Sequence, residues 1–177
     1  MADRQVLLPE APAMRIDVKE LLREPIGAQA QMGFDLGFQR LSDELVVHGI
    51  RGRLKLLRIE EGILVQGVLA VTVDLECGRC LRPVTQVIDV ELDEQFVSSL
   101  TYKPGDDQVF AIDADHHIDL KPVLHDVVTV SMPIRVLCRP GCQGLCPSCG
   151  KDLNEGPCDC QADDVDPRLA ELRAFIE

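Results

Sequence analysis

The chain has no tryptophan, one tyrosine and five phenylalanines, so aromatic residues make up only 3% of its 177 residues. A core must therefore be built from leucine, valine and isoleucine, which a hydrophobic fraction of 46% allows. Basic residues are also scarce, because 18 lysines and arginines stand against 30 aspartates and glutamates, for a net charge of −12. Such a chain repels phosphate, which argues against non-specific nucleic-acid binding and favours basic protein partners.

Long apolar runs are missing as well. The longest extends from Ile63 to Val73, is interrupted by a glutamine, a glycine and a threonine, and is too short to cross a bilayer. The first residues, MADRQVLLPEAPAM, lack the basic start and the apolar segment of a signal peptide. We therefore expect a cytoplasmic protein with no membrane partner.

Cysteine, in contrast, is abundant and clustered. Six of the eight cysteines lie between residues 137 and 160, and the other two form a Cys-x2-Cys pair upstream. The reducing cytoplasm disfavours disulfides, whereas a Cys-x2-Cys turn followed by glycine, as at Gly150, is typical of half a zinc shell. The sequence therefore predicts one or two structural Zn²⁺ ions. The predicted ligands are Cys77, Cys80, Cys138, Cys142, Cys146, Cys149, Cys158 and Cys160.

The order of the cysteines favours two sites of four ligands each. Cys77 and Cys80 lie at a predicted hairpin tip and cannot close a shell alone, so we pair them with Cys138 and Cys142. The second predicted site then contains the remaining four, Cys146, Cys149, Cys158 and Cys160. A rival partition places Cys138, Cys142, Cys146 and Cys149 on one ion and leaves the others reduced. A redox role for the first pair is less favoured, because that motif usually opens a helix within a βαβ unit.

Hydrophobic periodicity predicts an α+β fold: an antiparallel β-meander or partly open barrel, a few short helices and a C-terminal cysteine-rich, zinc-binding tail. Apolar residues alternate with Arg51, Arg53 and Lys55 in a first strand, and a turn at residues 60–62 leads into a second strand at 63–76. A third alternating run, at 84–92, follows the first cysteine pair. We expect a sheet region at 1–97, a loop or linker at 98–117, and a helix with the cysteine tail at 118–177, all in one compact unit.

Three aspartates mark predicted helix starts. Asp17, with Glu20 three residues on, predicts a short helix that Pro25 ends. Asp119 precedes apolar residues at helical spacing, and Asp166 precedes Pro167 near the C-terminus.

No arrangement of residues points to catalysis. The chain shows no Ser/His/Asp set, no phosphate-binding glycine loop and no paired carboxylates at a pocket, and an all-cysteine metal shell leaves no open position. We therefore predict no catalytic residues, no further cofactor and no small-molecule substrate. The alternative is a zinc- or thiol-dependent enzyme acting on RNA or redox partners. His116, His117 and His125 are expected in solvent, and Arg51, Arg53 and Lys55 form either a solvated face or, with Arg79 and Arg82, an RNA-binding patch.

Four blocks in a fixed order resemble the YceD family of large ribosomal RNA subunit accumulation proteins. They are LECGRCLRPV, IDLKPVLHDVVTVSMPIRVLC, CQGLCPSCGKDLNEGPCDC and VDPRLAELRAF, and the resemblance extends from about Val71 to the C-terminus. It implies a role in large-subunit biogenesis and brings no catalytic residues. Combined with the acidic charge, it predicts binding to an assembling large subunit or to a basic ribosomal protein, with ribosomal RNA affected indirectly.

Overall fold

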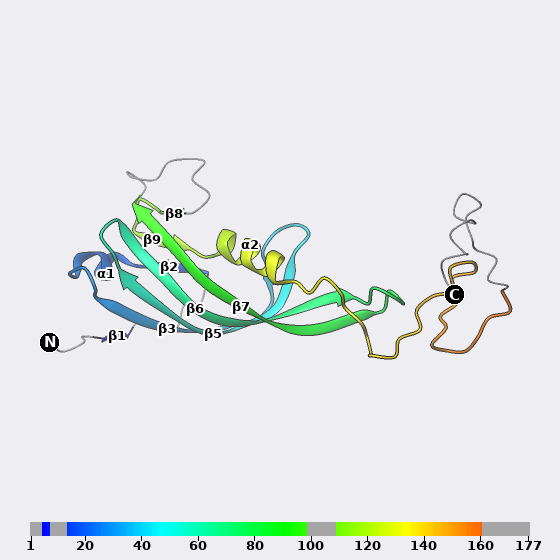
Figure 1. Cartoon of the computed structure of the whole chain (residues 1–177). Helices are drawn as coiled ribbons and strands as arrows, with labels where there is room; N and C mark the ends of the chain where they lie inside the picture. The colour runs from blue at the N-terminus through cyan, green and yellow to red at the C-terminus, as the bar shows by residue number, and fades with distance from the viewer. Residues whose placement is uncertain (1–4, 8–13, 99–108, 161–177) are drawn as a thin grey trace, which may run out of the picture. The chain divides into compact units, whose positions relative to one another are not determined.

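The computed structural model describes residues 5–7, 14–98 and 109–160 and contains nine strands and two helices in these ranges. The strands are β1 (Gln5–Leu7), β2 (Arg15–Asp17), β3 (Gln29–Leu36), β4 (Gln39–Arg40), β5 (Val46–Arg58), β6 (Gly62–Glu76), β7 (Pro83–Ser98), β8 (Val109–Ile112) and β9 (His117–Asp119). The helices are α1 (Lys19–Arg23) and α2 (Lys121–Ser131), labelled in Figure 1. Neither is long and apolar enough to span a membrane.

The chain forms two compact units. The sheet unit comprises Met1–Leu75 and Val84–Ile134, and the cysteine unit comprises Glu76–Pro83 and Arg135–Glu177. The chain therefore enters the cysteine unit twice, first at the turn between β6 and β7 and again after α2. The divisions at residues 97 and 117 stay predictions.

The sheet has the order β1-β3-β5-β6-β7-β8, and β4 also pairs with β5. β3–β5 and β5–β6 are antiparallel, whereas β1 and β8 add in parallel to the two edges. The predicted α+β meander is confirmed, and among the described strands the sheet is open rather than closed into a barrel. β8 lies in the segment predicted as a loop. Its four residues, Val-Phe-Ala-Ile, are all apolar and show no alternation, so only their pairing with the end of β7 makes them a strand.

The alternation along the central strands was predicted correctly. Ile50, Leu54 and Leu56 of β5 are buried, while Arg51 and Arg53 are exposed. The apolar side chains of β3, β5, β6 and β7 form one core with residues from α1, α2, β2 and β9. The helices and the small β2–β9 sheet thus cover one face of the large sheet, and no described element covers the opposite face (Figure 1).

Both described helices start one residue later than predicted. Asp17 and Asp119 are the last residues of β2 and β9, and the N-cap positions are Val18 and Leu120. The prediction placed the aspartates at the N-cap, but each lies one residue before it. From there each carboxylate accepts a 2.9 Å hydrogen bond from the backbone N–H two residues on, which is the first residue of the helix. α1 ends before Pro25, as predicted. The helix predicted at Asp166 lies outside the described residues.

Candidate metal centre

The described part of the cysteine unit has almost no apolar core of its own. Among its described residues, the buried apolar side chains are all cysteines, namely Cys77, Cys80, Cys142 and Cys146. Leu81, at 60% exposure, and Pro147 lie at its surface. A unit whose interior consists of thiols needs another source of cohesion, and sulfur-bound metal is one that small domains use.

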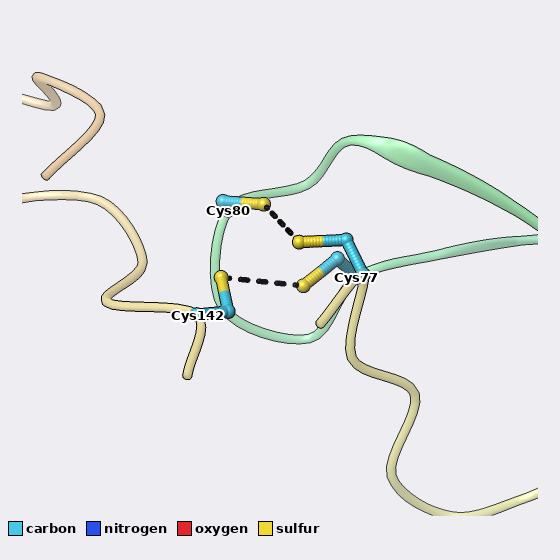
Figure 2. A group of neighbouring side chains, drawn as sticks. Cys77, Cys80 and Cys142 are labelled. Atoms are coloured by element: carbon cyan, nitrogen blue, oxygen red, sulfur yellow. Dashed lines mark hydrogen bonds between the residues drawn. The ribbon is translucent and has the colours of Figure 1, made fainter. Parts of the chain in front are cut away.

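Cys77, Cys80, Cys138 and Cys142 form a first cluster, with all four Sγ atoms within 4.8 Å of one another. The Sγ atoms of Cys77 and Cys142 are 3.8 Å apart, and those of Cys80 and Cys138 are 3.6 Å apart. Figure 2 shows the side chains of Cys77, Cys80 and Cys142 converging from the hairpin turn and the later segment. A disulfide would need about 2.05 Å. A tetrahedral shell with Zn–S bonds of about 2.3 Å has edges of about 3.8 Å, so the spacing fits a metal ion.

Cys146, Cys149, Cys158 and Cys160 form a second cluster that meets the same 4.8 Å limit. Cys146 is buried, while Cys149 and Cys160 are exposed. The structure therefore brings the eight cysteines together in the two groups that the preferred partition paired. Each group offers four sulfur atoms and could hold one metal ion.

The two Cys-x2-Cys turns have the same backbone hydrogen bonds. The N–H of Cys77 donates to the carbonyl of Arg82 at 2.9 Å, and the N–H of Cys146 donates to the carbonyl of Lys151 at 2.8 Å. In each turn the residue after the second cysteine donates to the carbonyl of the first, also at 2.9 Å. That residue has a left-handed backbone in both turns, with φ +59° at Leu81 and +72° at Gly150. A glycine after the second cysteine, used above as a sign of a metal-binding turn, is therefore present in only one of two turns with the same backbone structure.

Opposing pKa shifts show that the thiols compete for charge. Hydrogen bonds from the backbone of Cys80 lower the pKa of Cys77 to about 6, and those from Cys149 lower the pKa of Cys146 to about 6. Loss of hydration among the clustered sulfurs, followed by a hydrogen bond with the Cys80 thiol, raises the pKa of Cys138 to about 12. A hydrogen bond with Cys149 raises the pKa of Cys160 to about 12. Each cluster thus contains one cysteine whose low pKa favours the thiolate at neutral pH. It also contains one whose high pKa keeps the thiol protonated unless a cation lies beside it.

Polar residues lie beside the first cluster, and the sequence predicted a role for Arg79 and Arg82 only in RNA binding. Asn154 Nδ2 lies 3.5 Å from Cys142 Sγ. Arg82 Nη2 pairs with Asp152 Oδ2 at 2.7 Å and with Glu155 Oε1 at 2.6 Å, so it is not a free cation for RNA. Arg79 donates to the carbonyl oxygen of Cys142. No spacing rule predicts these contacts, because they join segments far apart in sequence.

The remaining residues singled out from the sequence lie in the sheet unit. Arg51 and Arg53 are exposed and Lys55 is half-buried on the open face, and Arg51 Nε pairs with Asp35 at 3.0 Å. His116 is exposed as expected, and His125 lies on α2 with a partly exposed side chain, as a helix-surface residue should. His117 was expected in a solvated loop and is instead half-buried in β9. Among the described residues, neither cysteine cluster includes a histidine.

Comparison with known proteins identifies a matching family and several relatives of this chain. The family model described as large ribosomal RNA subunit accumulation protein YceD matches residues 65–176. An uncharacterized protein of Mycobacterium tuberculosis (strain H37Rv) is 35% identical over 179 residues, which covers 97% of this chain and 83% of the relative. The large ribosomal RNA subunit accumulation protein YCED homolog 1, chloroplastic, of Zea mays is 26% identical over 65% of this chain and 46% of its own length. The uncharacterized protein YlbN of Bacillus subtilis is 28% identical over 58% of this chain and 60% of its own length.

No solved structure matches the chain. The family model nevertheless covers both cysteine clusters, β7 and α2, together with most of β6. The chain therefore belongs to the YceD family of large ribosomal RNA subunit accumulation proteins.

Proposed function

We propose that this protein is a non-catalytic, zinc-stabilised factor for accumulation of the large-subunit ribosomal RNA, and that it acts by binding a basic ribosomal protein or the assembling subunit. Family membership supports the process, since both the family and the maize relative are named for it. The cytoplasmic location expected from the sequence accompanies this proposal.

The donor chemistry supports zinc. Each cluster supplies four sulfur atoms and no oxygen or nitrogen ligand, a set that suits Zn²⁺ and excludes hard cations such as Mg²⁺. Four thiolates also complete a tetrahedral shell and leave no position for a substrate, which supports a structural role. In that role the ion supplies the cohesion that buried apolar side chains other than cysteine do not supply among the described residues of the unit.

The charge pattern on the open face of the sheet supports a protein partner over free RNA. The basic row is Arg51, Arg53 and Lys55 of β5, and these residues lie beside Ala70, Val68 and Gln66 of β6. On β7, the acidic row consists of the exposed residues Asp89, Glu91 and Asp93.

Two contacts fix how the acidic row lies against β6. Gln66 Nε2 donates to Asp93 Oδ1 at 2.9 Å, and Thr85 Oγ1 donates to Asp74 Oδ1 at 2.6 Å. Both contacts correspond to one antiparallel register, in which the acidic row runs alongside the basic row with only β6 between them. Two strand spacings are about 10 Å, roughly one Debye length at 0.1 M salt, so a phosphate on the basic row is repelled by the acidic row.

Matched charge reversals test the partner. The basic-row variant replaces Arg51, Arg53 and Lys55 by Glu, and the acidic-row variant replaces Asp89, Glu91 and Asp93 by Lys. Both change three charges on the same face, all of them exposed except that of the half-buried Lys55. Binding is measured for purified basic large-subunit proteins and for purified large-subunit RNA, each at several salt concentrations.

We expect the parent protein to bind a basic ribosomal protein in a salt-sensitive manner and to bind RNA weakly. The basic-row variant should keep or strengthen protein binding, and the acidic-row variant should weaken it, because attraction between opposite charges is lost. Tight RNA binding by the parent that disappears in the basic-row variant would show that the basic row is an RNA site and would refute the proposed route.

A further inference from the structure

Asn154 connects the two cysteine clusters. It lies in the eight-residue segment between Cys149 and Cys158, both in the second cluster, yet its side-chain amide reaches Cys142 in the first. Its Nδ2 is 3.5 Å from Cys142 Sγ, within hydrogen-bond range for sulfur. A segment held at both ends by one cluster therefore donates a hydrogen bond to a member of the other.

Three further hydrogen bonds of the amide, and one of the Asn154 backbone, hold this residue in place. Asn154 Oδ1 accepts from Arg139 Nη2 at 2.8 Å and from the backbone N–H of Gln143 at 2.9 Å. The backbone N–H of Asn154 and its Nδ2 both donate to Asp152 Oδ1, at 2.8 and 2.6 Å. Because Oδ1 faces two donors, the orientation of the amide is fixed and Nδ2 must face the sulfur and the carboxylate.

Arg82 supplies a second connection from the opposite direction. It belongs to the turn of the first cluster, where its carbonyl accepts the N–H of Cys77. Its guanidinium pairs with Asp152 and Glu155, which flank Asn154 in the segment of the second cluster. Backbone pairing adds to this, since the N–H of Leu145 donates to the carbonyl of Arg79 at 3.0 Å. Folding of the 150–157 segment is thus tied to the geometry of both clusters.

We propose that Asn154 is a positioning residue for the first cluster, and that through Asn154 and Arg82 the two clusters bind metal cooperatively. The inference rests on the proposed zinc binding. An N–H donor to a coordinating thiolate offsets part of its charge and fixes its direction, and loss of such an outer contact typically costs 10- to 100-fold in metal affinity. Ordering of the 150–157 segment by metal in the second cluster places this donor, so each site raises the affinity of the other by the same factor.

The first measurement uses the unmodified protein and Zn²⁺ alone. Native mass spectrometry during stepwise zinc addition to reduced, metal-free protein counts the species with no, one and two ions. Cooperative binding makes the one-ion species rarer than independent sites predict. Independent sites with a statistical distribution would overturn the inference while leaving the proposed function intact, whereas absence of any zinc-bound species would refute the zinc proposal itself.

A double-mutant cycle then locates the coupling. Cys158→Ser with Cys160→Ser removes the second site, and the zinc affinity of the first site is read by competition with a chelator. We expect this change to weaken the first site about tenfold in the parent and much less in an Asn154→Ala background, because the connection is already cut. Equal losses in both backgrounds would refute the role of Asn154.

Gln143→Ala is the matched control. It also removes a side-chain amide next to Cys142, but Gln143 contributes its backbone N–H to this network. Its zinc affinity should equal that of the parent, whereas Asn154→Ala should lower the affinity of the first site 10-fold or more and shift the sulfur-to-metal absorption band of the Co²⁺ form. An unchanged Co²⁺ spectrum and affinity in Asn154→Ala would show that the amide has no positioning role.

Discussion

Replacing Gly150 by alanine isolates the backbone cost of a Cys-x2-Cys turn. Gly150 has φ +72°, and a Cβ built there meets no atom within 4 Å, so no steric clash contributes. A left-handed backbone costs a non-glycine residue about 1–2 kcal/mol, and the lower entropy of the unfolded alanine chain returns about 0.4–1 kcal/mol. The net loss is roughly 1 kcal/mol, which is about a fivefold weaker metal affinity for the second cluster.

Leu81→Gly is the mirror experiment in the equivalent turn. Leu81 has a left-handed backbone at φ +59°, which is strained for a leucine, so a glycine there relieves the strain. The side chain is 60% exposed, so its removal loses little buried apolar area. We expect the first cluster to bind Zn²⁺ as tightly as in the parent or up to about fivefold more tightly.

Chelator competition measures both variants, each at the cluster that contains the substitution, and circular dichroism of the sheet serves as the folding control. The reasoning would be refuted if Gly150→Ala bound zinc like the parent, or if Leu81→Gly lost more than about threefold in affinity.

Two further predictions concern the sheet unit. A Cβ on Gly62 would lie 1.9 Å from the carbonyl oxygen of Phe96, so Gly62→Ala must push β6 away from β7 and should lower the free energy of unfolding by roughly 3 kcal/mol. Gly37→Ala, where no atom lies within 4 Å, should change it by less than about 0.5 kcal/mol in the same urea titration, and equal effects of the two would contradict the close approach. Hydrogen bonds from the backbone of His117, together with Arg15, lower the pKa of Asp113 to about 2. Because a lowered carboxyl pKa stabilises the fold above the unfolded value of about 3.9, that contribution disappears as the pH falls from about 4 to 2. The stability advantage of the parent over Asp113→Asn should therefore shrink across this window, and a constant difference in urea unfolding would show that Asp113 is not responsible.

Sequence periodicity predicted the central sheet well because its strands have one buried and one open face. Burial of every second side chain produces an alternation of apolar and polar residues in the sequence, and β5 and β6 show this alternation over most of their length. The short edge strands gave no such signal. β8 and β4 owe their strand conformation to pairing with β7 and β5, which depends on distant residues.

The candidate site was partly predictable for a similar reason. Cys-x2-Cys pairs are local, so spacing identified Cys146 and Cys149 and their upstream counterparts directly. Asn154 and Arg82 could not be found in this way, because their significance depends on the segments that meet around Cys142. Leu81 was missed because a leucine in a left-handed conformation is held there by its surroundings, against its own preference.

The position of the first cluster along the chain has a consequence for the whole protein. Cys80 and Cys138 are 58 positions apart, and the intervening chain contains β7, β8, β9 and α2. An ion that joined these two sulfurs would close a loop of the chain that contains these four elements of the sheet unit. By the chain-entropy estimate used for covalent cross-links, closure of a loop of this length removes roughly 4 kcal/mol of unfolded-state freedom. If the proposed zinc occupies this cluster, removal of the metal should therefore lower the free energy of unfolding of the sheet unit as well as that of the cysteine unit.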